Sequence, residues 1–296
     1  MSQVLHVRNL TKSYGKFNAV DDVSFSIEEN RIYGLLGRNG AGKTTIMNMI
    51  TAQLFPTSGE LKVFGEEPYE NKRVLSRMCF IKESQKYPEN FRIDDVLATA
   101  AIFYPNWDPE FAASLVEDFR LPLKRKMKKL SRGMLSSVGI IIGLACRAPL
   151  TIFDEPYLGL DAVARTLFYD RLMQDYTEHP RTVILSTHLI DEVSAMLEHV
   201  LVIDSGKLLL NEDADALRGR AYSVAGKATK VEQFVAGRRA IHRDTFGSLA
   251  SATLMGSLNT DARRQAELLN LEIAPVSMQQ LIVHLTTEKT QAKGGE

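Results

Sequence analysis

RIYGLLGRNGAGKTTIMNMIT, residues 31–51, joins a short apolar strand to a glycine-rich loop and the start of a helix. Gly37, Gly42, Lys43 and Thr44 fill the pattern G-x-x-x-x-G-K-[ST]. The glycines allow the positive φ and close approach by which several backbone N–H groups converge on one phosphate. Lys43 adds a positive charge, Thr44 a hydroxyl for Mg²⁺, and the helix N-terminus its positive dipole. The stretch therefore predicts a phosphate-binding loop.

The residues on both sides of the loop support this interpretation. Before it, four apolar residues make the expected strand: Ile32, Tyr33, Leu35 and Leu36. After it, Ile46, Met49 and Ile50 fall on one face of a helix. The alternative, a glycine-rich turn without a ligand, does not explain this strand–loop–helix order.

The composition is that of a globular protein. Of 296 residues, 45% are hydrophobic and 24% charged, which is enough for one large domain or two smaller ones. Lys plus Arg equals Asp plus Glu at 36 each, so no overall basic field argues for a nucleic-acid partner. The longest apolar run, residues 138–146, is too short to span a bilayer. Any membrane role is expected to come through a surface or a partner.

The N-terminus and the cysteines suggest a cytosolic protein. The first 17 residues, MSQVLHVRNLTKSYGKF, lack the apolar segment of a signal peptide. Cys79 and Cys146 lie in apolar surroundings without metal-ligand spacing, which predicts buried free thiols.

The flanking segments indicate several layers. Strands are expected around residues 4–9, 23–27 and 61–64 and near the end of residues 74–83, with a hairpin over 200–210. Tyr14, in the glycine-containing stretch KSYGKF, is either a core anchor or a stacking platform. Residues 90–148 change to helical spacing and predict a separate helical layer. The basic run at 124–129 favours a solvated face over a contact with phosphates or lipid headgroups.

Two later strands end in polar side chains. LTIFDE, residues 150–155, is an apolar run that ends in paired acids, and VILSTH, residues 183–188, ends in a histidine. A strand buried on both faces has a reason to end in Asp154 and Glu155 if they meet a cation and a water at the carboxyl edge of the sheet. His188 alone would be a structural histidine, but beside a phosphate loop it is a candidate γ-phosphate sensor.

Taken in order, six segments resemble the ATP-binding cassette of ABC transporters over residues 3–212: Tyr14, GRNGAGKTT (37–45), LSRGM (130–134), IFDEP (152–156), GLD (159–161) and STH (186–188). The resemblance implies an α/β fold with a RecA-like P-loop NTPase core, an antiparallel β subdomain and a helical subdomain. It also implies a head-to-tail dimer, homodimer or heterodimer, in which each ATP lies between the phosphate loop of one protomer and the signature segment of the other.

The resemblance also implies residue roles. Tyr14 would stack on adenine, Thr44 and Asp154 would serve Mg²⁺, Glu155 would polarise the attacking water, and His188 would touch the γ-phosphate. Asp161 would lie at the dimer interface, and Ser131 and Gly133 would bind the partner's ATP. The loop residues that would hold the phosphates are Gly37, Arg38, Asn39, Gly40, Ala41, Gly42, Lys43, Thr44 and Thr45.

Two positions depart from the family pattern. Arg132 and Met134 replace a glycine and a glutamine of the usual LSGGQ, which predicts weaker or partner-dependent closure. Where the family commonly has a metal-contacting glutamine, alignment places Glu83, with Gln85 close by. Either could coordinate the metal; Glu83 is favoured.

Residues 213–296 lie outside the cassette and predict a small α+β accessory domain. Their order is strand 222–225, helix 231–235, strands 240–243 and 249–254, helix 262–269, strand 271–275, which would suit a ferredoxin-like fold. A last helix is expected over 278–285, and the tail 291–296 is expected to be disordered. Such appendages resemble those of ABC-2-type exporter ATPases.

These features together predict a Mg²⁺-dependent ATPase subunit that drives a separate transmembrane permease subunit, an exporter, from the inner face of the cell membrane. The alternatives are a soluble cassette ATPase without a transport role and a nucleotide-gated regulator that scarcely hydrolyses ATP. Glu155 argues against the regulator.

Overall fold

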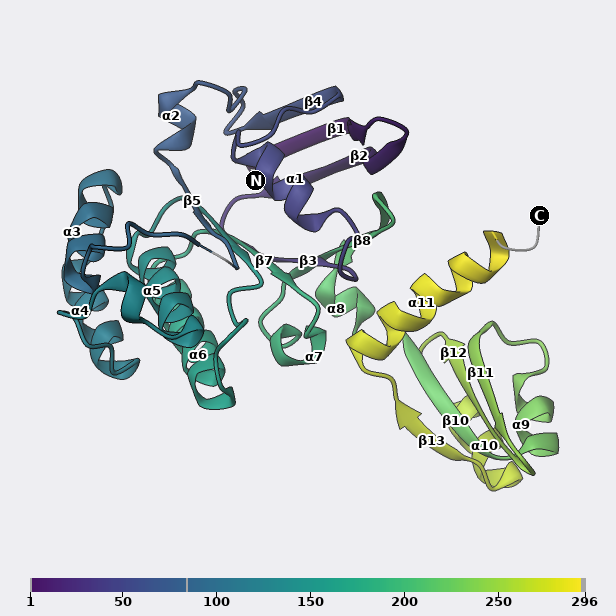
Figure 1. Ribbon diagram of the computed structural model, residues 1–296. Helices are drawn as coiled ribbons and strands as arrows, with labels where there is room; N and C mark the ends of the chain where they lie inside the picture. Colours follow the sequence, from purple (N-terminus) through teal and green to yellow (C-terminus); the bar gives the residue numbers. More distant parts are fainter. Residues whose placement is uncertain (1, 84, 294–296) are drawn as a thin grey trace. The chain divides into compact units, whose positions relative to one another are not determined.

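A computed structural model describes residues 2–83 and 85–293 of the chain. The chain forms two compact units (Figure 1). The first holds Met1–His188 and Met196–Asn211, and the second holds Leu189–Ala195 and Glu212–Glu296. The short segment after His188 therefore belongs with the C-terminal residues.

A six-stranded sheet is the centre of the first unit. Its order is β5 (Met78–Ile81), β6 (Leu150–Asp154), β7 (Thr182–Thr187), β3 (Ile32–Leu36), β8 (His199–Asp204) and β9 (Lys207–Asp213). The pairs from β5 to β8 are parallel. Every residue of β3, β6 and β7 is buried, as expected for strands covered on both faces. Because β6, β7 and β3 are neighbours, the residues that follow them meet at one edge.

A second, antiparallel sheet packs over one face of the first. It has the order β2 (Phe17–Glu28), β1 (Gln3–Tyr14) and β4 (Ser58–Val63). Helix α1 (Lys43–Ile50) buries Ile46, Met47 and Met49 in the same apolar core as residues from both sheets. This core fixes the helix that begins in the phosphate loop.

A helical layer contacts the first sheet. It contains α3 (Ile93–Phe103), α4 (Pro109–Asp118), a 3₁₀ turn (Met127–Lys129) and α5 (Arg132–Ala145). Helix α5 contacts α3, α4, β5, β6 and α6 (Ala162–Glu178). A Cβ at Gly143 would lie 2.4 Å from Cε1 of Phe153, so glycine is what lets α5 approach β6 this closely. Cys79 and Cys146 are buried free thiols, as predicted.

The strand predicted near the end of residues 74–83 is β5, which begins at Met78. Before it, Lys72–Leu75 form a helical turn, α2. The reason is local: the Asn71 side chain accepts a hydrogen bond from the backbone N–H of Val74 and caps the turn.

The second unit contains a four-stranded antiparallel sheet with its own core. The sheet order is β11 (Ala240–Phe246), β12 (Leu249–Met255), β10 (Ala221–Lys227) and β13 (Glu272–Pro275). Helix α9 (Ala228–Val235) joins β10 to β11, and α10 (Thr260–Leu269) joins β12 to β13, which is a βαββαβ order. Val224, Phe234 and Leu254 are fully buried in this core.

Three further helices complete the second unit. Helix α8 (Ala214–Leu217) precedes the sheet, and α11 (Met278–Lys293) contacts both α7 (Ile190–Val193) and β11. The helix predicted over residues 278–285 is therefore too short, and residues 291–293 of the predicted disordered tail are helical. Residues 294–296 lie outside the described residues.

Candidate functional site

The glycines of the loop are required by backbone geometry. Gly37 has φ +155° and Gly42 has φ +109°. A Cβ at Gly37 would lie 2.2 Å from the carbonyl oxygen of Ile203, and one at Gly42 would lie 2.5 Å from that of Ala19. Only glycine allows this wrapped conformation, which leads directly into the N-terminus of α1. The loop is thus shaped to present backbone to an anion.

Lys43 is held at the centre of the loop. Its Nζ donates to the carbonyl oxygens of Gly37 at 2.8 Å and Arg38 at 3.2 Å. It also lies 3.7 Å from Oε1 of Glu155, an ion pair longer than a hydrogen bond. Burial lowers the pKa of Lys43, and the carboxylates of Glu155 and Asp154 oppose that shift.

The acids at the end of β6 meet the first turn of α1. Thr44 Oγ1 donates a hydrogen bond to Oδ2 of Asp154 at 2.8 Å. Within the described residues, Asp154 Oδ1 and Glu155 Oε1 are buried and receive no hydrogen bond. Buried oxygens of this kind are costly unless something satisfies them. A hydroxyl and a carboxylate are ligands that Mg²⁺ accepts, so Thr44 and Asp154 fit that ion.

Glu155 is joined to the end of β7. Its Oε2 lies 2.9 Å from Nδ1 of His188, and the Tyr157 hydroxyl also hydrogen-bonds to Oε2. Burial raises the pKa of Glu155, while His188 and Lys43 oppose the shift. A carboxylate with a raised pKa is a better proton acceptor, which suits a group that activates water.

Tyr14 ends β1 and is 53% exposed, with Lys12 Nζ 5.3 Å from the ring centroid. Its hairpin partner strand, β2, passes beside the loop, because Ala19 and Val20 contact the position of Gly42. The exposed ring favours the stacking platform over the core anchor that the sequence left open.

The signature residues gather at the N-terminus of α5. Ser131 is its N-cap and accepts from the backbone N–H of Met134 at 3.2 Å. A Cβ at Gly133 would lie 2.6 Å from the Gly159 carbonyl oxygen, so the GLD loop packs against this helix end. Asp161 is the N-cap of α6, where it accepts from the N–H of Ala164 at 2.8 Å. Within its own protomer, the side-chain oxygens of Ser131 and Asp161 each already accept a hydrogen bond in a helix cap.

The two positions that depart from the family pattern contact each other. Arg132 Nη2 lies 2.7 Å from Oε1 of Glu83. Together with Gln85 they line a cavity of about 360 Å³. Among the described residues, no three His, Cys, Asp or Glu side chains form a group that could hold a metal, so Glu83 does not complete one with Asp154 and Glu155. A metal role for Glu83 stays a prediction, and it requires this ion pair to open.

Sequence reasoning missed Tyr157 and Thr187. Both hydroxyls lie in the site, with Thr187 Oγ1 3.0 Å from the Tyr157 oxygen. In the sequence, Tyr157 directly follows Pro156 and Thr187 directly precedes His188, and this closeness to the predicted site residues could have indicated them. The sequence alone did not show that the two segments touch.

The sequence of this chain is similar to a known family of proteins. The ABC transporter family model matches residues 20–158. The bacitracin transport ATP-binding protein BcrA of Bacillus licheniformis is 32% identical over 74% of this chain and 73% of its own length. This chain belongs to the ABC transporter ATP-binding proteins. It therefore binds ATP and has the ATPase fold of that family.

Other relatives agree with this assignment. The ABC transporter ATP-binding protein YtrB of Bacillus subtilis is 26% identical over 73% of this chain and 74% of its own length. A solved structure of the ATP binding subunit of an ABC transporter superposes with a TM-score of 0.66 at 25% identity, and covers 72% of this chain and 91% of that one. The coverage stops short of the whole chain in each case.

Proposed function

We propose that this protein is the Mg²⁺-dependent ATPase subunit of an exporter, in which Glu155 orients the water that attacks the γ-phosphate of ATP. The observation that carries the proposal is the contact between three chain segments: Thr44 on Asp154, and Glu155 between Lys43 and His188. This arrangement supplies a phosphate cradle, a metal-ligand pair and a base at one sheet edge.

Mg²⁺ would be held by Thr44 Oγ1 and Asp154, whose Oδ1 is buried and has no hydrogen-bond partner among the described residues. When bound, the ion would neutralise charge that develops on the phosphates. Lys43 and the loop backbone would orient the nucleotide, and Tyr14 would stack on its base. His188 would contact the γ-phosphate through the ring that Glu155 holds.

The transport role is supported by the relatives. One is named for bacitracin transport, and the Nod factor export ATP-binding protein I of Cupriavidus metallidurans is 30% identical over 70% of each chain. Within the described residues no helix is long and apolar enough to cross a membrane. We propose that a separate permease subunit recruits this chain to the membrane's inner face, and that two cassettes close on ATP through Ser131 and Gly133.

The substitution Glu155→Gln tests this proposal. We expect hydrolysis to fall by about 10³-fold, within the range of general base catalysis, while ATP still binds. ATP should then trap a dimer, which size-exclusion chromatography with and without ATP would detect. Native turnover in this variant would remove Glu155 from its role. A wild-type chain that binds ATP but does not turn it over, even with its permease, would favour the nucleotide-gated regulator.

A further inference from the structure

Tyr157 lies at the centre of the hydrolytic residues. It follows Glu155 by two positions, is 3% exposed, and its ring meets that of His188 edge-on, with centroids 5.7 Å apart. We propose that Tyr157 is a positioning residue for ATP hydrolysis, whose hydroxyl holds Glu155 and His188 in one orientation. The inference rests on the proposed function of Glu155.

The Tyr157 hydroxyl has one proton to donate and two lone pairs with which to accept. The hydroxyl donates to Oε2 of Glu155, which as a carboxylate can only accept. It accepts from Oγ1 of Thr187 at 3.0 Å and from the backbone N–H of His188 at 3.2 Å, and its oxygen also lies 3.0 Å from Nδ1 of His188. The Tyr157 hydroxyl thereby links the Glu155 side chain, which follows β6, to Thr187 and His188 at the end of β7.

The same bonds give the two oxygens of Glu155 different environments. Oε2 receives the Tyr157 hydroxyl and faces Nδ1 of His188 at 2.9 Å. Oε1 lies 3.7 Å from Nζ of Lys43 and receives no hydrogen bond from the residues that the structure describes. One oxygen is therefore fixed, and the other remains available to accept a proton from water.

Glu155 needs such support because of its backbone. Its φ is +50°, a left-handed conformation that is uncommon outside glycine. Its N–H donates to the carbonyl oxygen of Ser186 at 3.1 Å, which anchors the backbone but not the side chain. The Tyr157 hydroxyl and Nδ1 of His188 together constrain the side chain at Oε2. Loss of the hydroxyl should leave ATP binding intact and misorient the carboxylate.

The test is Tyr157→Phe in the full-length chain, which keeps the ring and removes only the hydroxyl. We expect kcat to fall by about tenfold, corresponding to the loss of one oriented contact. KM for ATP, the affinity for a fluorescent ATP analogue and the unfolding midpoint should remain close to wild type. If Tyr157 had only a structural role, Tyr157→Phe would lower the unfolding midpoint and would not lower kcat selectively.

Tyr176→Phe is the matched control. The Tyr176 oxygen lies 2.7 Å from the carbonyl oxygen of Asn30 and 2.7 Å from Glu198 Oε2, beside the amino ends of β3 and β8, and its one proton is shared between these two acceptors. Its removal should leave kcat unchanged. Equal kcat in Tyr157→Phe and wild type, or a higher kcat in the variant, would overturn the inference.

A double variant shows whether Tyr157 acts through Glu155. In the Glu155→Gln background, Tyr157→Phe should slow the residual single-turnover rate by less than twofold, an order-of-magnitude limit for coupled residues. A further tenfold loss there would mean that Tyr157 acts independently, and would refute the positioning role. If wild-type protein itself fails to hydrolyse ATP, the proposed function fails instead.

Discussion

Lys43 is a buried cation whose ammonium group donates hydrogen bonds to protein oxygens instead of to water. Burial lowers its pKa, and Glu155 and Asp154 partly restore it. The two carbonyl oxygens that Nζ contacts belong to the loop itself, so the ammonium group is in place before a phosphate arrives. Such preorganisation reduces the entropy lost when ATP binds.

Lys43→Ala should therefore abolish tight ATP binding. We expect the Kd for a fluorescent ATP analogue to rise by at least about 100-fold, because a charge-assisted phosphate contact of about 3 kcal/mol is lost. Lys62→Ala is the control, since Lys62 pairs with Glu60 at the surface of β4. Unchanged affinity in Lys43→Ala would show that the phosphates bind elsewhere.

Arg132 and Glu83 allow a second test at the residue scale. Their side chains are 65% and 43% exposed, so the ion pair adds little to folding stability. If Glu83 serves the metal, Arg132→Gln should free it and lower the Mg²⁺ concentration for half-maximal ATPase activity severalfold. Adding Glu83→Gln should cancel that gain. The same Mg²⁺ response in the single and double variants would exclude Glu83 as a ligand.

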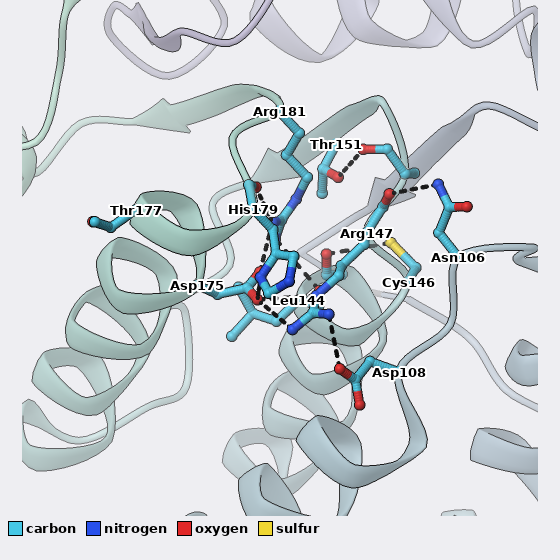
Figure 2. Close-up of polar contacts among 12 residues, drawn as sticks. Asn106, Asp108, Leu144, Cys146, Arg147, Thr151, Asp175, Thr177, His179 and Arg181 are labelled. Atoms are coloured by element: carbon cyan, nitrogen blue, oxygen red, sulfur yellow. Dashed lines mark hydrogen bonds and ion pairs between the residues drawn. The ribbon is translucent and has the colours of Figure 1, made fainter.

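At the scale of elements, a buried ion network joins the helical layer to the sheet (Figure 2). Asp175 on α6 is contacted by Arg181, just before β7, at 2.5 Å, and by Arg147, just after α5, at 2.9 Å. Arg147 also reaches Asp108, the N-cap of α4, at 2.8 Å. Three segments of the first unit thus meet at the Asp175 carboxylate, and Arg147 extends the network to a fourth through Asp108.

Asp175→Asn should destabilise the first unit strongly. It leaves the buried guanidinium of Arg181 without its counter-charge, which typically costs about 3 kcal/mol. Urea unfolding followed by the fluorescence of Trp107, which lies next to Asp108, would measure the loss. Arg73→Gln, which breaks the exposed pair with Glu66, should cost only about 0.5 kcal/mol. Similar losses in both variants would contradict the central role of Asp175.

At the scale of the whole molecule, two stacked histidines predict a pH response in the second unit. His284 on α11 stacks on His242 of β11, with ring centroids 4.0 Å apart, and His242 pairs with Asp244 at 2.8 Å. Burial and the neighbouring His242 lower the pKa of His284, against a smaller opposite effect of Asp244. Protonation of His284 therefore favours the undocked state of α11.

The sign of the pH dependence follows from this shift. A histidine with a lowered folded pKa contributes stability that is full above its unfolded pKa, about 6.5, and declines as the pH falls through that value. Hydrogen exchange of α11, corrected for intrinsic rates, should show more opening at pH 5.5 than at pH 7.5. His284→Gln should remove most of the difference. The same pH difference in that variant would assign it to other groups.

Several elements could be predicted because their signals are local. The loop, α1 and the buried strands β3, β6 and β7 follow from glycine spacing and apolar periodicity, and the structure has each of them. The end of the last helix was predicted wrongly, because α11 continues to Lys293 beyond its apolar segment. The turn that Asn71 caps before β5 was not predicted, because one side chain decides it.

The sequence by itself determined the phosphate loop, the acids after β6 and the histidine after β7, because each is encoded within a few consecutive residues. Only the tertiary structure decided which of them touch. Tyr157 meets His188, and Glu83 meets Arg132, because the order of the strands and the packing of α5 bring distant segments together. Such contacts depend on how the helices and sheets pack together, which a pattern within a few consecutive residues does not determine.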